Sequence, residues 1–375
     1  MKIAVFVSYL PPHHGGIEVV TEQQIKNLSS AGHDISVVTS ACGAEPGTFT
    51  HAGYKIIRIR AWNYFEEKMG AVFPIFAPSL WWQSYRVVKQ SDVVHAHDAF
   101  YMTSLAAAVW ARLLKKPLVL TQHVDMVPHP NGLVRFAQQV VYATTGRFII
   151  RSSSRVIVLN TRVADFIKSK GVGASKIIFL ANAVDTSRFK PVSKRRKSQL
   201  RRRYGVSQDA LLALFVGRFV PKKGIDVILG MAPISGVEIV LGGGKMPAKA
   251  KRSDRHFMGV VSRADAPEIF QMCDIFVLPS QGEGFPVTIQ EAMASGLAVV
   301  TTDDPAYMAY ELDRRYISFV SPTADTLQAA LARLASQPDL IVAAGAYARG
   351  YAQVHFDQRL QTAKLGALYE SLVGV

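Results

Sequence analysis

Residues 275–301 read IFVLPSQGEGFPVTIQEAMASGLAVVT, and this stretch decides the fold class. It begins with four large apolar residues, 275–278, which are typical of a buried strand. A loop with two glycines and two prolines follows, then a helix-forming segment over 287–294 and a second apolar run over 298–301. Strand, helix and strand in this order predict two parallel strands joined by a helix, which is the unit of a doubly wound α/β sheet.

The same alternation extends in both directions and indicates two domains. The chain has 375 residues, more than one hydrophobic core usually organises, and 49% of them are hydrophobic. Residues 185–203 are polar and basic and include Pro191, which predicts the connection between the domains. We therefore expect two Rossmann-like α/β domains facing a cleft. The expected strands are 3–7, 35–38, 56–59, 93–95, 118–120, 156–159, 177–180, 211–216, 238–241, 275–278 and 298–301, and the expected helices are 19–31, 103–114, 162–170, 225–231, 287–294, 326–335 and 356–373.

Composition predicts a cytoplasmic protein. No apolar run reaches the roughly 18 residues that cross a bilayer, and the best candidate, 69–82, contains two prolines. Prolines and a paired glycine follow residues 1–10, where a signal peptide would place its cleavage site. Cys42 and Cys273 lie in different predicted domains and lack metal-ligand spacing, which predicts free thiols in a reducing compartment.

The net charge of +15 predicts an anionic partner or surface. Basic residues gather at 194–203, where a solvated helix face is an equal alternative, and again at 147–155. Over 133–155 apolar residues alternate with basic ones, which predicts a helix that lies on anionic lipid. Peripheral association with the inner face of the cytoplasmic membrane is therefore an expectation.

The loop before the helix at 287–294 offers groups that bind anions. Backbone N–H groups of residues 284–287 lie at the start of that helix, where unpaired donors and the helix dipole favour phosphate oxygens. Pro286 lacks an N–H but suits a first helical turn. Glu283 precedes the helix and Glu291 lies inside it, so that two carboxylates are expected beside one ligand.

This segment resembles the Glu-x7-Glu signature of the retaining GT-B glycosyltransferases, the glycogen-synthase-like superfamily, of the family 4 type. The likeness spans nearly the whole chain. Two positions depart from the family pattern: Ala183 stands where relatives have glycine, and 302–305 lack the usual paired glycine, and both departures concern the donor preference more than the activity. The other matching segments are PPHHGGI at 11–17, DVVHAH at 92–97, TQH at 121–123, NAVD at 182–185, VGR at 216–218, and Lys223 with Gly224.

The resemblance implies transfer of a sugar from a UDP- or GDP-sugar to a cell-envelope, polysaccharide or lipid-linked acceptor, with retention of the anomeric configuration. It implies an acceptor-side domain over 1–184, a nucleotide-sugar-binding domain over 185–355, and a terminal helix over 356–375 packed back on the first domain. Arg218 and Lys223 would bind the donor diphosphate. The Arg218 guanidinium would donate two parallel hydrogen bonds, and the Lys223 ammonium would act as a mobile point charge. The chain has no Asp-x-Asp motif, so no metal and no other cofactor is expected.

Three other features complete the expected site. His123 matches the family histidine beside the donor sugar, although a packed or capping histidine is an equal alternative. Gly15 and Gly16 open a helix and let backbone amides approach a ligand, although a tight turn also explains them. Strand alternation is expected to bury one of His95 and His97 and to leave His97 in the cleft. The expected catalytic residues are Glu283, His123, Arg218 and Lys223, and the expected donor-binding residues are Gly15, Gly16, Arg218, Lys223, Gly284, Phe285, Pro286, Val287 and Glu291.

Aromatic residues crowd one irregular stretch of the first half. They are expected to stack on sugars or to meet a membrane interface, with core packing an equal alternative. Two other functions stay open: a nucleotide-sugar epimerase of the same architecture, and a nucleic-acid-binding protein. The chain lacks a recognition-helix or base-stacking motif, so no nucleic acid is expected as a partner. The aromatic residues are Trp62, Tyr64, Phe65, Phe73, Phe76, Trp81 and Trp82.

Overall fold

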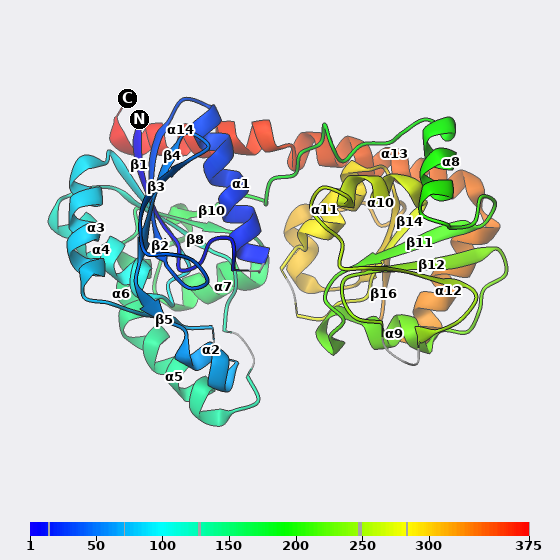
Figure 1. The fold of residues 1–375 in the computed structure, drawn as a ribbon, viewed down its shortest axis with the longest axis horizontal. Helices are drawn as coiled ribbons and strands as arrows, with labels where there is room; N and C mark the ends of the chain where they lie inside the picture. Colours follow the sequence, from blue (N-terminus) through cyan, green and yellow to red (C-terminus); the bar gives the residue numbers. More distant parts are fainter. Residues whose placement is uncertain (14–15, 71, 127–128, 247–249, 283, 375) are drawn as a thin grey trace. The chain divides into compact units, whose positions relative to one another are not determined.

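The computed structural model describes residues 1–13, 16–70, 72–126, 129–246, 250–282 and 284–374. The chain divides into two compact units: Met1–Ala183 with Gln361–Val375, and Val184–Leu360. Each unit contains a sheet of mainly parallel strands covered by helices (Figure 1). This confirms the predicted class of two Rossmann-like α/β domains.

The first unit is built on an eight-stranded sheet in the order β10-β9-β8-β7-β1-β2-β4-β3. Within it only the pairing of β3 with β4 is antiparallel. The strand order reverses between β1 and β7, and ligands of such sheets bind beyond the carboxyl ends of the strands at this point. The strands are β1 (Lys2–Phe6), β2 (Asp34–Ser40), β3 (Gly47–His51), β4 (Tyr54–Ile59), β7 (Val93–His97), β8 (Leu118–Gln122), β9 (Arg155–Val158) and β10 (Ile177–Phe179), with β5 (Ala61–Trp62) and β6 (Ile75–Phe76) in a separate small sheet.

Both faces of this sheet are covered, which explains its continuous apolar strands. In β1, Ala4 and Phe6 belong to one core, and Ile3 and Val5 belong to the core on the opposite face. Tyr369 of the terminal helix α14 is fully buried in the second core, so α14 (red in Figure 1) is part of this unit. The helices are α1 (Gly16–Ser30), α2 (Tyr64–Met69), α3 (Ser79–Gln90), α4 (Met102–Leu113), α5 (Gly132–Ala143), α6 (Thr145–Ser152), α7 (Thr161–Ser169) and α14 (Gln358–Val373).

The second unit has a six-stranded sheet in the order β13-β12-β11-β14-β15-β16, and all of its strand pairs are parallel. The order reverses between β11 and β14, so the loops that follow these two strands meet at one edge of the sheet. The strands are β11 (Leu211–Val216), β12 (Val237–Gly242), β13 (Arg255–Gly259), β14 (Ile275–Leu278), β15 (Ala298–Thr302) and β16 (Ile317–Val320), and the helices are α8 (Lys194–Arg203), α9 (Ile225–Gly230), α10 (Ala266–Met272), α11 (Val287–Ala294), α12 (Ala324–Ser336) and α13 (Pro338–His355).

The prediction of one helix over 133–155 is wrong. Helix α5 ends at Ala143 and α6 begins at Thr145, because Thr144 has φ −112° and ψ −96°, outside the helical region. Arg155 opens strand β9 and belongs to neither helix. The residues of this segment therefore lie on three elements: α5, α6 with Arg147 and Arg151, and β9 with Arg155.

Residues 194–203, predicted as part of the connection, form helix α8 of the second unit. Arg196 and Arg203 each form a 2.7 Å ion pair with Glu268, and Lys197 and Arg201 pair with Asp274. Four basic residues of this helix thus bind acidic groups of their own domain. No helix among the described residues is long and apolar enough to cross a membrane, and Cys42 and Cys273 are free thiols.

Candidate functional site

Three loops pack closely where the strand order of the second sheet reverses. The N–H of Gly217, just after β11, donates to the carbonyl of Gly242 at 3.0 Å, and the N–H of Gly243 donates to that of Gly259 at 2.7 Å. A Cβ on Gly243 would lie 1.7 Å from the Gly217 carbonyl oxygen, so only glycine fits there. The loops after β11 and β12 are therefore held backbone to backbone.

The loop after β11 also contacts the loop that leads into α11. Gly224 has φ +75°, and a Cβ on it would lie 2.2 Å from the carbonyl oxygen of Pro279. The N–H of Gln281 donates to the carbonyl of Lys222 at 2.9 Å. The structure thus brings the loop that carries Arg218 and Lys223 against the loop that precedes α11, as the expected diphosphate site requires.

The two cations of this loop differ in exposure. Arg218 is exposed and forms no ion pair in the part of the chain that the structure describes. Lys223 is half-buried and ends a short 3-10 turn, Pro221–Lys223. The Arg218 guanidinium therefore keeps its donors available for an anion.

The start of α11 has backbone N–H groups that a ligand could bind, and the residue Phe285 just before it is held by packing. No described side chain caps this helix, so its first-turn N–H groups keep the donors that helices leave unpaired. Phe285 is buried and its ring stacks on Tyr310 at 4.2 Å, while the Gln290 side-chain amide donates to the Phe285 carbonyl at 3.2 Å. Gly284 is half-buried, and Glu283 lies outside the described residues.

Glu291 lies one turn inside α11, and burial raises the pKa of its carboxyl to about 8, although Arg263 and Arg188 oppose that shift. At neutral pH the free site therefore holds a largely protonated carboxyl, which both donates and accepts hydrogen bonds. The Arg188 guanidinium donates to the Arg263 carbonyl at 3.0 Å, and Asp185 Oδ1 accepts from the N–H groups of Ser187 and Arg188. Neither arginine is among the predicted site residues, and the local sequence signal for them is that Arg188 closely follows the 182–185 motif.

The prediction for the paired histidines of β7 is wrong. His95 and His97 are both buried, with 0% and 2% exposure, and their rings stack at 4.5 Å. Residues two apart on a strand point to the same face, so alternation does not separate them. His97 Nδ1 lies 3.0 Å from His123 Nε2, and the structure thus gathers the histidines of β7 against His123.

His123 follows β8 and is held at two points. Its N–H donates to Asp98 Oδ1 at 2.8 Å, and its ring meets His97. Burial lowers the pKa of His123 to about 4, although Glu18 opposes that shift, so the imidazole is neutral at pH 7. Burial also raises the pKa of Asp98 to about 7, despite hydrogen bonds from the amides of His123 and Val124.

The glycine loop lies at the switch point of the first sheet, between β1 and α1. Gly16 opens α1, and a Cβ on it would meet nothing within 4 Å, so packing within the protein does not require glycine there. Gly15 lies outside the described residues. His13 Nδ1 lies 2.8 Å from Glu18 Oε1, and its Nε2 lies 3.2 Å from Glu66 Oε1, which ties this loop to α2.

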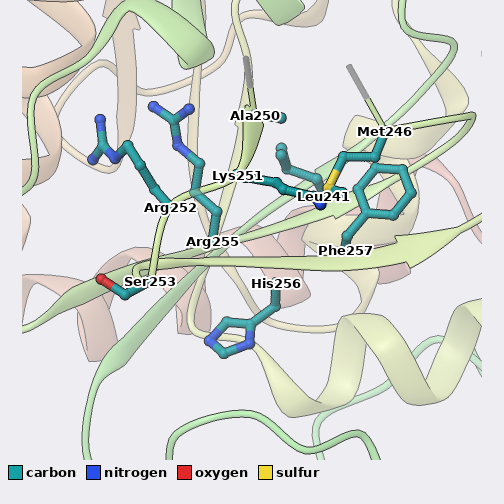
Figure 2. A pocket seen from close by; sticks show the side chains of 9 residues that line it. All are labelled: Leu241, Met246, Ala250, Lys251, Arg252, Ser253, Arg255, His256 and Phe257. Atoms are coloured by element: carbon teal, nitrogen blue, oxygen red, sulfur yellow. The ribbon is translucent and has the colours of Figure 1, made fainter. Parts of the chain in front are cut away.

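A cavity along the edge strands of the second sheet contains none of the predicted site residues (Figure 2). Arg252 donates to Asp254 and to the Met231 carbonyl, and Arg255 donates to the Leu229 carbonyl at 3.0 Å. His256, on the opposite side of β13, lies 2.6 Å from Glu238. Arg252, Arg255 and His256 thus each have at least one polar contact within the second unit. No group of three or more metal-ligating residues occurs within the described ranges.

Both units match known families. Residues 14–188 match Glycosyltransferase Family 4, and residues 196–351 match Glycosyl transferases group 1. The chain is therefore a glycosyltransferase with the GT-B fold, built from a family 4 domain and a group 1 domain.

The chain is similar to the GDP-mannose-dependent alpha-mannosyltransferase of Corynebacterium glutamicum, with 24% identity over 80% of this chain and 72% of the relative. It is 26% identical to the UDP-Gal:alpha-D-GlcNAc-diphosphoundecaprenol alpha-1,3-galactosyltransferase of Escherichia coli, over 80% of each chain. The crystal structure of Anabaena HepE in complex with UDP shares the fold, with a TM-score of 0.77, 18% identity, and coverage of 99% of this chain and 100% of HepE.

Proposed function

We propose that the protein is a retaining hexosyltransferase that moves a sugar from a UDP- or GDP-sugar to a lipid-linked or polysaccharide acceptor of the cell envelope. The observation that carries this proposal is the contact between the loop of Arg218 and Lys223 and the loop before α11. Two cations and a helix N-terminus at one sheet edge suit a diphosphate. The names of the two sequence relatives specify GDP-mannose and UDP-Gal, which favours a nucleoside diphosphate as the shared donor element.

In the proposed reaction, an acceptor hydroxyl oxygen bonds to the anomeric carbon on the face from which the diphosphate leaves. The bond between that carbon and the β-phosphate oxygen breaks, its electron pair stays on the diphosphate, and the diphosphate takes the hydroxyl proton. Arg218 and Lys223 stabilise the departing charge. Glu283 holds hydroxyls of the transferred sugar and Glu291 binds the ribose hydroxyls. The neutral imidazole or backbone carbonyl of His123 stabilises positive charge that develops near the anomeric carbon.

We propose that no metal or other cofactor takes part, because cationic side chains and the α11 amides supply the positive field. Incubation with a panel of UDP- and GDP-sugars in excess chelator is expected to show slow donor hydrolysis and, with acceptor, a product of unchanged anomeric configuration by NMR. A requirement for added Mg²⁺ or Mn²⁺ would contradict the metal-free mechanism. Absence of UDP and GDP binding by calorimetry would contradict the donor assignment. Interconversion of the sugar without transfer would indicate an epimerase.

We also propose that the first domain docks on anionic lipid at the cytoplasmic face of the membrane. Helix α5 buries polar residues and exposes apolar ones: Gln138 is buried, whereas Leu133, Phe136 and Val140 are 68%, 61% and 44% exposed. Such a face suits the boundary between headgroups and acyl chains. The net charge of +15 favours an anionic lipid surface, and the E. coli relative is named for a lipid-diphosphate acceptor.

The aromatic residues of the first half divide between core and surface. Phe76 is buried and Trp81 packs against the core of the first unit. Trp62, Tyr64 and Trp82 are 54%, 55% and 60% exposed. Phe65 and Phe73 contact each other at 6.3 Å, and Phe73 contacts Phe100 at 5.1 Å. Core packing therefore applies to Phe76 and Trp81, whereas stacking on sugars or contact with a membrane interface stays a prediction for the exposed residues.

Replacement of Leu133 and Phe136 together by serine is expected to weaken binding to vesicles of anionic phosphatidylglycerol by about a hundredfold or more, because each substitution removes an exposed apolar side chain whose burial in lipid would contribute about 1.5–3 kcal/mol. Vesicle sedimentation at low salt measures this. Leu113→Ser is the matched control, because Leu113 is 64% exposed at the end of another helix. Equal binding by the double variant and the control would show that α5 does not contact lipid.

A further inference from the structure

We propose that His97 is a positioning residue that fixes the tautomer and orientation of His123, so that His123 carries its proton on Nδ1 and accepts a hydrogen bond at Nε2. The catalytic consequence of this inference rests on the function proposed above, whereas the tautomer itself does not. No part of the sequence pattern indicates such a contact, since His97 ends β7 whereas His123 follows β8.

The contact between the two rings is short and shielded from water. His97 Nδ1 lies 3.0 Å from His123 Nε2, and the two rings face each other edge to edge, with centroids 5.3 Å apart and planes 17° apart. His97 is 2% exposed and His123 is 7% exposed. A hydrogen bond in such surroundings exchanges little with solvent and is costly to leave unmade.

Both rings are neutral at physiological pH. Burial lowers the pKa of His97 well below its ordinary value, and His95 and His123 add to this effect. Burial lowers the pKa of His123 to about 4. A neutral imidazole carries one N–H and one lone pair. One of the two facing nitrogens must therefore donate, and the other must accept.

The other nitrogen of His97 decides which ring donates. His97 Nε2 is buried and has no hydrogen-bond partner among the described residues. A proton there would be a buried donor without an acceptor, which protein interiors avoid. The proton of His97 therefore lies on Nδ1 and points at His123 Nε2, with Thr21 Oγ1 at 3.5 Å as a weaker second acceptor. His123 Nε2 is then the acceptor, and its own proton lies on Nδ1.

A second layer of contacts holds the His97 ring in place. His95 stacks on His97, and both nitrogens of His95 are engaged: Nδ1 lies 2.6 Å from the Tyr369 hydroxyl, and Nε2 lies 2.7 Å from Thr121 Oγ1. Tyr369 belongs to α14 and is fully buried. The terminal helix thus contacts the His97 ring indirectly, through His95.

In the proposed reaction, the fixed tautomer affects the groups that His123 presents to the transferred sugar. With Nε2 bound to His97, the His123 ring can offer only an Nδ1–H donor, which does not stabilise positive charge, so that role falls to the backbone carbonyl. The backbone N–H of His123 is bound to Asp98 at 2.8 Å. His123 and Thr121 border a small cavity together with residues of α1 and α14. A fixed ring and a fixed peptide hold the carbonyl of His123 in one direction, which is what stabilisation of charge near an anomeric carbon requires.

NMR of the full-length protein with ¹⁵N-labelled histidine tests the tautomer directly, with the His123 signals assigned by their loss in His123→Gln. The expected result for the wild type is protonated Nδ1 and unprotonated Nε2 at pH 7. In His97→Leu the preference for this tautomer is expected to be lost. In His97→Asn it is expected to persist, because the asparagine side-chain amide can donate from near the position of Nδ1. His51→Leu is the control, since His51 is exposed on β3.

A wild-type His123 with the proton on Nε2 would overturn the proposal, whether or not the variants fold. So would a folded His97→Leu protein in which His123 keeps the same tautomer. In the transfer assay, kcat is expected to fall about tenfold to a hundredfold in His97→Leu, with a smaller change in donor KM and recovery in His97→Asn. If the wild type shows the expected tautomer but transfers no sugar, the proposed function fails and the positioning of His123 stands.

Discussion

Replacement of Arg218 by alanine is expected to lower kcat/KM for the nucleotide-sugar donor by about 10²–10³-fold, the loss typical of removing one preorganised donor from developing negative charge. Arg218 lies in the loop that Gly243 and Gly224 hold against its neighbours, so the guanidinium is carried on a fixed backbone. It is exposed and forms no ion pair within the described residues, so its removal leaves no acidic partner uncompensated. The loss should therefore appear in catalysis and in affinity for UDP or GDP, with little change in stability.

Two further variants separate the contribution of the bidentate guanidinium geometry from that of positive charge alone. Arg218→Lys keeps the charge but loses the bidentate geometry, and intermediate activity is expected. Arg195→Ala removes an exposed arginine from α8, a helix that packs against α10, and near-wild-type activity is expected. Steady-state kinetics and calorimetry with the nucleoside diphosphate measure both effects. Arg218→Ala activity equal to that of Arg195→Ala would show that Arg218 does not face the donor.

The fold was predictable where strands are buried on both faces. Segments 211–216 and 275–278 form β11 and β14 with the predicted bounds, because their apolar runs reflect complete burial. Strand β13, Arg255–Gly259, was missed because it is an edge strand with half-buried residues and no apolar run. Strand β3 was missed for the same physical reason, since all its residues are exposed.

The candidate site was predictable only where its groups lie close in sequence. The loop of Arg218 and Lys223 and the start of α11 each carry a local signal. Their contact depends on the backbone approach of Gly224 to Pro279, which no local pattern encodes. The placement of Arg188 beside Arg263 and of His97 beside His123 likewise joins elements distant along the chain.

The second large effect concerns stability. Asp274→Ala is expected to lower the free energy of unfolding of the second unit by about 3–5 kcal/mol, because it leaves the buried charge of Arg201 without its acidic partner. Asp274 Oδ2 accepts from Arg201 Nη2 at 2.7 Å and from the Leu212 N–H at 2.8 Å, and Oδ1 accepts from Lys197 at 2.5 Å. The side chains of Arg201 and Asp274 are only 8% and 15% exposed, so solvent screens this pair weakly.

Chemical denaturation followed by circular dichroism measures this change. Asp209→Ala removes an exposed carboxylate just before β11, the strand whose Leu212 N–H binds Asp274, and a change within about 0.5 kcal/mol is expected. Arg201→Met combined with Asp274→Leu removes both charges and should recover part of the lost stability, because no charge is then left unpaired. If Asp274→Ala unfolds like Asp209→Ala, the ion pairs of Asp274 with Lys197 and Arg201 do not stabilise the domain. The basic run at 194–203 would then be better described as a solvated helix face.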